Sequence, residues 1–264
     1  MTFGRGLRAG LMGFRALVVA ALVAYAGLPE DAAQAGPLIQ NGSFEQTSNI
    51  SSPGGYICGN GAGNTCISNL LDWTSTCAPG QACGGHGTPS SILYANTNGS
   101  AFNGGIGLAG TIANSPDGGN YIAIDADPTY RSSISQTIAG LTAGQSYVLT
   151  FYQAAAQQSG GTTATTEQWQ VTFGSSVQTS ALMSDKAGGF VPWQVVTLDF
   201  IATSSSQVLT FLALGGPTGD PPVALLDGLT LSVPEPGSMA LLGGGVIALL
   251  AARRRARSKE GILF

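Results

Sequence analysis

Charged residues and histidine are scarce in this chain of 264 residues. Charged side chains make up 9 % of it, whereas about 25 % is usual in soluble domains. A single histidine, His86, excludes metal sites built from several imidazoles and most histidine-dependent catalysis. Between the two ends of the chain, Lys and Arg are too few for the clustered basic surface that binds nucleic acid, so we expect no nucleic-acid partner.

The few charges of the central part are almost all negative. Residues 36–233 contain two basic residues, Arg131 and Lys186, and ten acidic ones, which gives a net charge of −8. Hydrophobic residues make up 44 % of the chain, which excludes a disordered polyelectrolyte. An acidic folded body favours cation binding and opposes binding to acidic polymers.

Residues 1–35 have the pattern of a secretory signal peptide. Three arginines precede the apolar run 16–28, and the small residues of Ala33-Gln34-Ala35 follow it. The run is too short for an ordinary membrane-spanning helix. We predict a signal-peptide helix that is cleaved by signal peptidase after Ala35; an uncleaved N-terminal anchor is the alternative.

Residues 234–257 combine a proline-containing motif, an apolar stretch and a basic cluster. Pro234, Glu235 and Pro236 precede the apolar residues 237–252, and Arg253, Arg254 and Arg255 follow them. Sixteen apolar residues are slightly fewer than the roughly 17–25 of a usual span. Arginines directly after such a stretch mark its cytoplasmic side. We predict a short transmembrane helix over 237–252 that holds the body outside the inner membrane before processing, with 258–264 as a short cytoplasmic tail.

This C-terminal arrangement resembles the PEP-CTERM sorting signal of Gram-negative bacteria. The resemblance implies recognition by an exosortase, a membrane-embedded processing enzyme, and transfer to the cell envelope, the cell surface or an exopolysaccharide matrix. Residues 258–264 extend beyond the point where such signals usually end. A plain C-terminal membrane anchor is the alternative.

From residue 119 onward, hydrophobic and polar residues alternate in short segments separated by Gly, Pro, Ser and Thr. Such segments predict β-strands, and several of them in succession indicate an all-β fold, a β-sandwich or jelly roll. We place this ectodomain at residues 36–233. The predicted strands are 120–125, 133–138, 146–153, 168–173, 193–201, 207–214 and 223–231.

All four cysteines fall in the Gly- and Ser-rich window 54–87, which we expect to be a surface loop. An even number of cysteines in an exported chain predicts disulfides, and three pairings are open. We favour Cys58–Cys66 and Cys77–Cys83, because each closes a short loop. A zinc site is the rival, but the window has no pair of cysteines at the spacing typical of zinc knuckles.

Short motifs spread over residues 38–232 resemble galactose-binding-like jelly rolls, which include many bacterial carbohydrate-binding modules. They are the residues 41–45, 72–73, 118–122, 134–147 and 224–229. In such modules, carboxylates at the positions of Glu45 and Asp227 hold one structural Ca²⁺ together with backbone carbonyl groups. Calcium binds six to eight hard oxygen ligands, which Asp and Glu provide. The alternatives are a solvated Glu45 and a two-residue hairpin turn at Asp227-Gly228.

Other residues are candidates for binding or catalysis. Tyr56, Tyr94 and Tyr130 lie in loop-like sequence and are candidates for contact with an exopolysaccharide. Asp125 and Asp127 are two residues apart, and paired carboxylates are required for glycoside hydrolysis, but an Asp before Pro is also typical of a turn. Glu167 is expected to be solvated at the start of its strand.

These observations predict a non-enzymatic, exported component of the cell surface or extracellular matrix. Carbohydrate binding by a lectin-like module is the alternative, and a polysaccharide hydrolase is a third reading. No nucleophile motif around a serine supports a hydrolase of the serine type.

Overall fold

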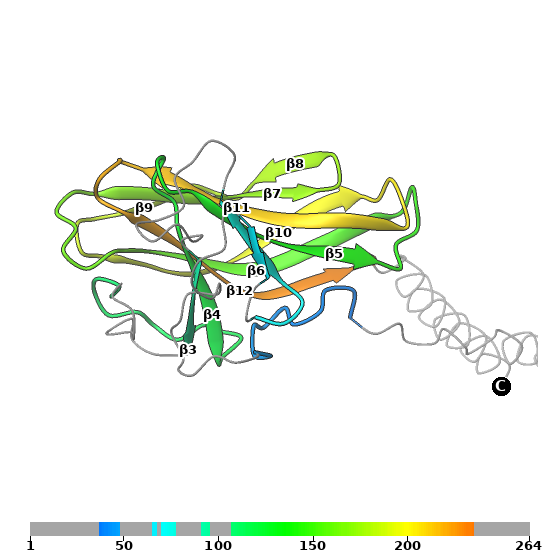
Figure 1. Cartoon of the computed structure of the whole chain (residues 1–264), viewed down its shortest axis with the longest axis horizontal. Helices are drawn as coiled ribbons and strands as arrows, with labels where there is room; N and C mark the ends of the chain where they lie inside the picture. The colour runs from blue at the N-terminus through cyan, green and yellow to red at the C-terminus, as the bar shows by residue number, and fades with distance from the viewer. Residues whose placement is uncertain (1–36, 48–64, 68–69, 78–90, 96–106, 235–264) are drawn as a thin grey trace, which may run out of the picture. The chain divides into compact units, whose positions relative to one another are not determined.

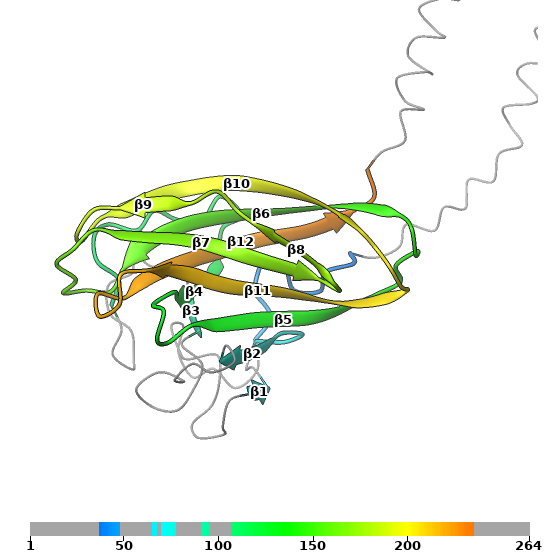
Figure 2. The same ribbon diagram turned by 90° about the horizontal axis from the view of Figure 1, so that it is seen from above.

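The computed structural model describes residues 37–47, 65–67, 70–77, 91–95 and 107–234. Within these ranges the chain forms twelve β-strands and no helix. The predicted all-β sandwich is confirmed, since the strands form two antiparallel sheets that face each other (Figures 1 and 2).

The first sheet has seven strands in the order β1-β2-β5-β11-β7-β8, and β9 also pairs with β7. Its strands are β1 (Thr65–Ile67), β2 (Thr74–Cys77), β5 (Ser132–Ala139), β7 (Thr165–Phe173), β8 (Ser176–Thr179), β9 (Met183–Asp185) and β11 (Ser206–Gly216). The second sheet has five strands in the order β10-β6-β12-β4-β3. Its strands are β3 (Ser91–Ala95), β4 (Asn120–Asp125), β6 (Ser146–Gln157), β10 (Phe190–Ile201) and β12 (Pro222–Ser232).

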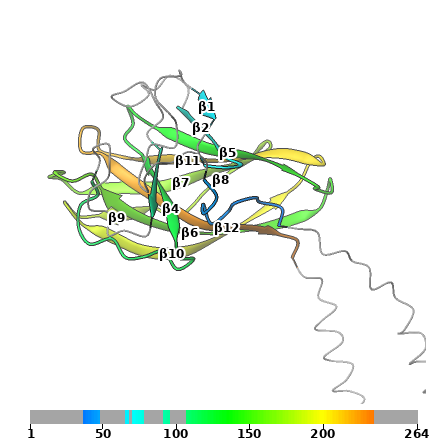
Figure 3. The ribbon, with the colours of Figure 1, turned by 60° about the horizontal axis from the view of Figure 1, so that its bottom comes forward.

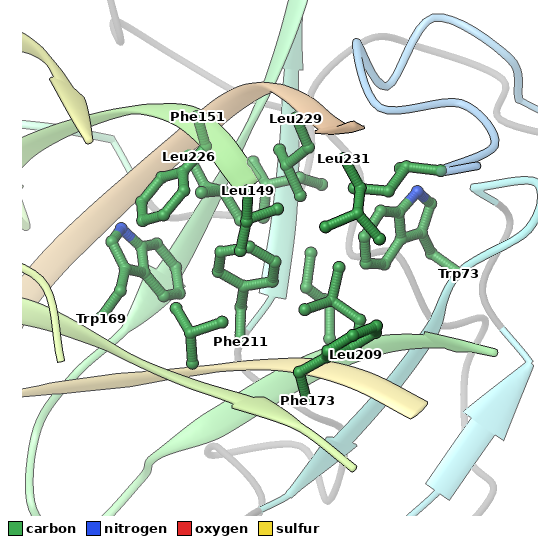
Figure 4. Close-up of a cluster of buried hydrophobic side chains, with 14 of the residues drawn as sticks. Trp73, Leu149, Phe151, Trp169, Phe173, Leu209, Phe211, Leu226, Leu229 and Leu231 are labelled. Carbon is green, nitrogen blue, oxygen red and sulfur yellow. The ribbon is translucent and has the colours of Figure 1, made fainter. Parts of the chain in front are cut away.

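The main hydrophobic core lies between the two sheets, because alternate residues of each strand point inward. Figure 4 shows Trp169 and Phe211 reaching from the seven-stranded sheet toward Phe151 of the five-stranded sheet. Phe211 makes edge-to-face contacts with both, at ring-centroid distances of 5.1 Å to Phe151 and 6.1 Å to Trp169. The indole N–H of Trp169 donates to the carbonyl oxygen of Leu225, 3.1 Å away. This bond links the two sheets and satisfies the buried donor.

A second, smaller core covers the outer face of the five-stranded sheet. Leu108 and Ile112, from the segment before β4, pack there with Tyr121 of β4 and Trp193 of β10. The rings of Tyr121 and Trp193 meet edge to face at 5.5 Å. Both faces of this sheet are therefore buried in part, which explains the run of consecutive buried residues in β4 and β12.

The structure differs from the sequence prediction in the short strands. The window 54–87 is not wholly a loop, because β1 and β2 lie in it and β2 pairs with β5. Strand β6 continues four residues beyond the predicted end, and two of these residues, Ala154 and Ala156, pack in the smaller core. The predicted signal peptide, transmembrane helix 237–252 and cytoplasmic tail lie outside the described residues. Among the residues that are described, no helix has the length and hydrophobicity needed to cross a membrane.

Candidate metal centre

Three segments that are distant in sequence meet at one place. They are the turn 41–45, residues 115–120 before and at the start of β4, and a bulge in β12. Figure 3 shows the first segment, in blue, next to β12. The Leu229 amide donates to the carbonyl oxygen of Gly42 at 3.0 Å, which joins the first and last parts of the described fold. Asn120 donates its backbone N–H to Glu45 Oε1 and its side-chain amide to the Phe44 carbonyl oxygen.

The turn that carries Glu45 is fastened to the core. Asn41 and Phe44 have left-handed backbone angles, with φ of 50° and 58°. The Asn41 side chain bonds to the backbone of Gln46 and Leu71, which stabilises the turn. Phe44 is fully buried and contacts Trp73 edge to face, so the next residue, Glu45, is held in a defined place.

The carboxylate of Asp227 comes from the bulge in β12. The pairing register between β12 and β6 shifts between Asp227 and Thr230, and Gly228 has a φ of 61°. The alternative reading of Asp227-Gly228 as a hairpin turn is therefore wrong, since β12 continues through it. Asp227 is fully buried; its Oδ1 accepts a hydrogen bond from Gly228 N at 2.8 Å, and its Oδ2 has no partner.

Burial raises the pKa of Asp227 to about 8. The negative charges of Asp117 and Glu45 raise this pKa further, while hydrogen bonds from Ser115 and Gly228 lower it. Glu45 and Asp117 are therefore close enough to Asp227 for their charges to act on it. A buried, partly unpartnered carboxylate with two acidic neighbours matches a site for a hard cation, which would satisfy Oδ2 and offset the repulsion.

Gly119 gives the Glu45 carboxylate the space that it occupies. Its φ is 63°, and a Cβ at this position would overlap Glu45 Oε1. The preceding residue, Gly118, also has a positive φ, but a Cβ there would meet only open space. The site therefore depends on glycine at 119 for a steric reason that does not apply at 118.

The described residues contain no group of three or more Asp, Glu, His or Cys side chains arranged to hold a metal ion. A cation at this place would thus have Glu45 and Asp227 as its carboxylate ligands, with Asp117 adding charge nearby. Backbone carbonyl groups and water would complete the six to eight oxygens that calcium prefers.

The other predicted site residues are described only in part. Tyr130 is 37 % exposed in the turn after β4, the side chain of Tyr94 in β3 is not described, and Tyr56 lies outside the described residues. Cys77 is buried and disulfide-bonded. Its partner is among the cysteines whose side chains the structure does not describe, so the predicted pairs stay predictions. Residues Glu235, Pro236 and Arg253–Arg255 also lie outside the described part.

Asp125 and Asp127 organise a turn. Asp125 Oδ1 accepts a hydrogen bond from Asp127 N at 2.8 Å. Asp127 is fully buried, and its two oxygens accept bonds from Thr129 N and Gly219 N, each at 2.7 Å. Both oxygens of Asp127 are thus bonded to backbone amides, which supports the turn interpretation rather than a catalytic pair.

Sequence reasoning missed two buried acids. Glu167, expected to be solvated, is fully buried in β7, and Asp185 of β9 is 5 % exposed. The prediction for Glu167 is wrong because β7 begins at Thr165, which places Glu167 on the same face as Trp169, Val171 and Phe173. The alternation that places residue 167 on the same face as residues 169, 171 and 173 was visible in the sequence.

The C-terminal part of the chain matches a known protein family. Residues 232–255 match the family described as the PEP-CTERM protein-sorting motif, which confirms the predicted sorting signal. The motif indicates an exported protein directed to the cell envelope of a Gram-negative bacterium. No curated protein has a significantly similar sequence.

Several solved structures resemble the chain. TmCBM61, solved with β-1,4-galactotriose, is 12 % identical over 75 % of this chain and 99 % of its own, with a TM-score of 0.41. The K1 cleaved adhesin domain of Lys-gingipain from Porphyromonas gingivalis W83 is 12 % identical over 65 % and 94 %, with a TM-score of 0.37. CBM28, a carbohydrate-binding module specific for non-crystalline cellulose, is 10 % identical over 52 % and 92 %, with a TM-score of 0.31. At these values the likeness carries no argument about what this chain binds.

Proposed function

We propose that this chain is a non-enzymatic component of the cell surface or extracellular matrix, and that one Ca²⁺ held by Glu45 and Asp227 stabilises its β-sandwich. The observation that carries the proposal is the unpartnered Oδ2 of the buried Asp227, which lies near two further carboxylates. A cation there would join the first and last parts of the fold. Such a tie suits a domain that must persist outside the cell.

The calcium site is tested by unfolding the processed protein, purified from the cell envelope, with Ca²⁺ and with a chelator. We expect chelation to lower the melting temperature of the wild type by more than that of Asp227→Asn and Glu45→Gln, because these two variants lack this site. Asp199→Asn removes the same charge from an exposed position on β10 and should respond to chelation like the wild type. Equal melting of the wild type with and without chelator would contradict the site.

We propose further that signal peptidase and an exosortase process the chain, and that the C-terminal helix anchors it in the inner membrane only before that processing. The matched sorting motif supports this route. The intact mass of the protein from the cell surface should lack the signal peptide and Arg253–Arg255 and should reveal any attached lipid or sugar. A mature protein that retains these arginines would indicate a plain membrane anchor instead.

Carbohydrate binding is the second candidate function, and the exposure of Tyr130 favours it. A half-exposed tyrosine ring on a turn can stack on a sugar. We expect binding of exopolysaccharide fragments to be lost in Tyr130→Ala and kept in Tyr130→Phe, because stacking needs the ring and not the hydroxyl. Exopolysaccharide turnover that is lost in Asp125→Asn would instead favour the hydrolase reading.

A further inference from the structure

One group of buried polar side chains outside the Glu45–Asp227 site contains two acids. Thr165 and Glu167 of β7 and Asp185 of β9 belong to it, with exposures of 1 %, 0 % and 5 %. Two acids buried side by side need compensation that hydrophobic neighbours cannot supply.

The strand register explains why these side chains meet. Thr165 lies directly opposite Asp185, and Glu167 lies opposite Met183. Directly opposed residues of an antiparallel pair point to the same face, and so do residues two apart in one strand. All three polar side chains therefore share the inner face of the seven-stranded sheet, which continues into Trp169 and the main core.

The oxygen atoms at this place lack partners. Both carboxylate oxygens of Glu167, Oδ2 of Asp185 and the hydroxyl of Thr165 are buried without a normal hydrogen bond. Across the interior, Gln153 of β6 donates to the Ala181 carbonyl oxygen just before β9, while its own Oε1 is also buried and unpartnered. When both carboxyl groups are ionised, four of these five atoms can only accept, and the single hydroxyl proton of Thr165 cannot serve all of them, so a cation would satisfy the rest.

The electrostatic surroundings of the two acids also favour a cation at this place. Burial raises the pKa of Glu167 to about 8; interaction with the Thr165 hydroxyl lowers this pKa, and the negative charge of Asp185 raises it. Burial also raises the pKa of Asp185, against the opposing effects of the backbone N–H and the charge of Lys186. The Lys186 side chain is exposed, so its single charge offsets the two buried carboxylates only in part.

We propose that Glu167, Asp185 and Thr165 bind a second Ca²⁺ ion, between the sheets and separate from Glu45 and Asp227. The two carboxylates match the charge of a divalent ion, and the Thr165 hydroxyl adds a neutral oxygen. The buried, unpartnered Gln153 Oε1 atom is a candidate for a ligand from the facing sheet. The site uses no residue of the proposed Glu45–Asp227 centre, so either site can exist without the other.

The test is the number of calcium ions bound by the processed protein, measured by equilibrium dialysis after removal of metal. We expect two ions for the wild type and for Asp199→Asn, and one ion for Glu167→Gln, Asp185→Asn and Asp227→Asn. Glu167→Gln and Asp185→Asn are independent variants, so a folding failure of one leaves the other as the test. Near-ultraviolet circular dichroism identifies the folded variants.

Several results would overturn the second site. Binding of no ion by the wild type would exclude it, and so would two ions kept in both Glu167→Gln and Asp185→Asn. A single ion in the wild type that is lost only in Asp227→Asn would exclude the second site and support the first. A single ion that is lost in Glu167→Gln or Asp185→Asn but kept in Asp227→Asn would support the second site and contradict the first.

Discussion

Trp193 donates its indole N–H to the carbonyl oxygen of Ala113, 2.9 Å away, and thereby fastens the segment before β4 to the outer face of the five-stranded sheet. Leu108 and Ile112 of this segment complete the smaller core beside Trp193. The chain itself thus covers much of a sheet face that could otherwise offer aromatic side chains to a ligand. The role of Trp193 is packing, as expected for tryptophans at strand positions.

Variants of Trp193 should separate its hydrogen bond from its packing. We expect Trp193→Phe to lower the free energy of unfolding by about 1 kcal/mol, because the contact with Tyr121 remains and one hydrogen bond is lost. Trp193→Ala should lower it by about 3 kcal/mol, because the ring is lost as well. Urea unfolding measures both. Val195→Ala, at a 61 % exposed position of β10, is the control; equal effects of all three would contradict the anchoring role.

Gly119 and Gly118 form a matched pair that tests the Glu45 site. Both have a positive φ, so alanine at either position should cost about 1 kcal/mol of backbone strain. Only Gly119→Ala places a Cβ on the Glu45 carboxylate, and we expect it to displace Glu45. Thermal unfolding with and without chelator should show that Gly118→Ala keeps the full calcium response of the wild type and that Gly119→Ala has a smaller one, like Asp227→Asn. The same calcium response in both variants would mean that the position of Glu45 is not required.

Asp125 should make stability depend on pH. Burial raises its pKa from 3.8 to about 7, so the folded state binds the proton more tightly than the unfolded state. This group therefore stabilises the fold below about pH 4, and the contribution is lost as the pH rises toward 7. We expect Asp125→Asn to gain stability relative to the wild type between pH 4 and 8, measured by urea unfolding at each pH. A constant difference across this range would contradict the raised pKa.

The sequence indicated the long strands because their inner faces alternate clearly. All seven predicted segments are strands, with β4 found at its predicted bounds and the others longer by one to several residues at their ends. In β7, for example, Trp169, Val171 and Phe173 are all buried, as the alternation implied. Burial of every second residue is a local property, so a local pattern can reveal it.

The short strands and the meeting of Asp117 with Asp227 could not be found in the same way. Strand β2 has the sequence Thr-Ser-Thr-Cys, and its pairing with β5 rather than its own hydrophobicity holds it in place. Strands β8 and β9 have four and three residues, too few for a period to show. The approach of Asp117 to Asp227 depends on the bulge in β12, and no local pattern of hydrophobic residues predicts that bulge.

Asp127 joins two loops at one end of the sandwich, and its variants should show what that link contributes. Its carboxylate accepts from Thr129 N in the turn after β4 and from Gly219 N in the loop between β11 and β12. Asn can accept only through its single carbonyl oxygen, so Asp127→Asn leaves one of these amides facing another donor. We expect Asp127→Asn to lower the free energy of unfolding by about 1–3 kcal/mol, and Asp127→Ala by more.

Urea unfolding with Asp199→Asn as the control tests this expectation. Asp199 is exposed, and its substitution should change the free energy of unfolding by no more than about 0.5 kcal/mol. Hydrogen exchange of the Gly219 amide gives a second, local measurement, since loss of its acceptor should accelerate exchange there before the core exchanges. If Asp127→Asn unfolds like Asp199→Asn and Gly219 stays protected, the two loops are held together by other contacts.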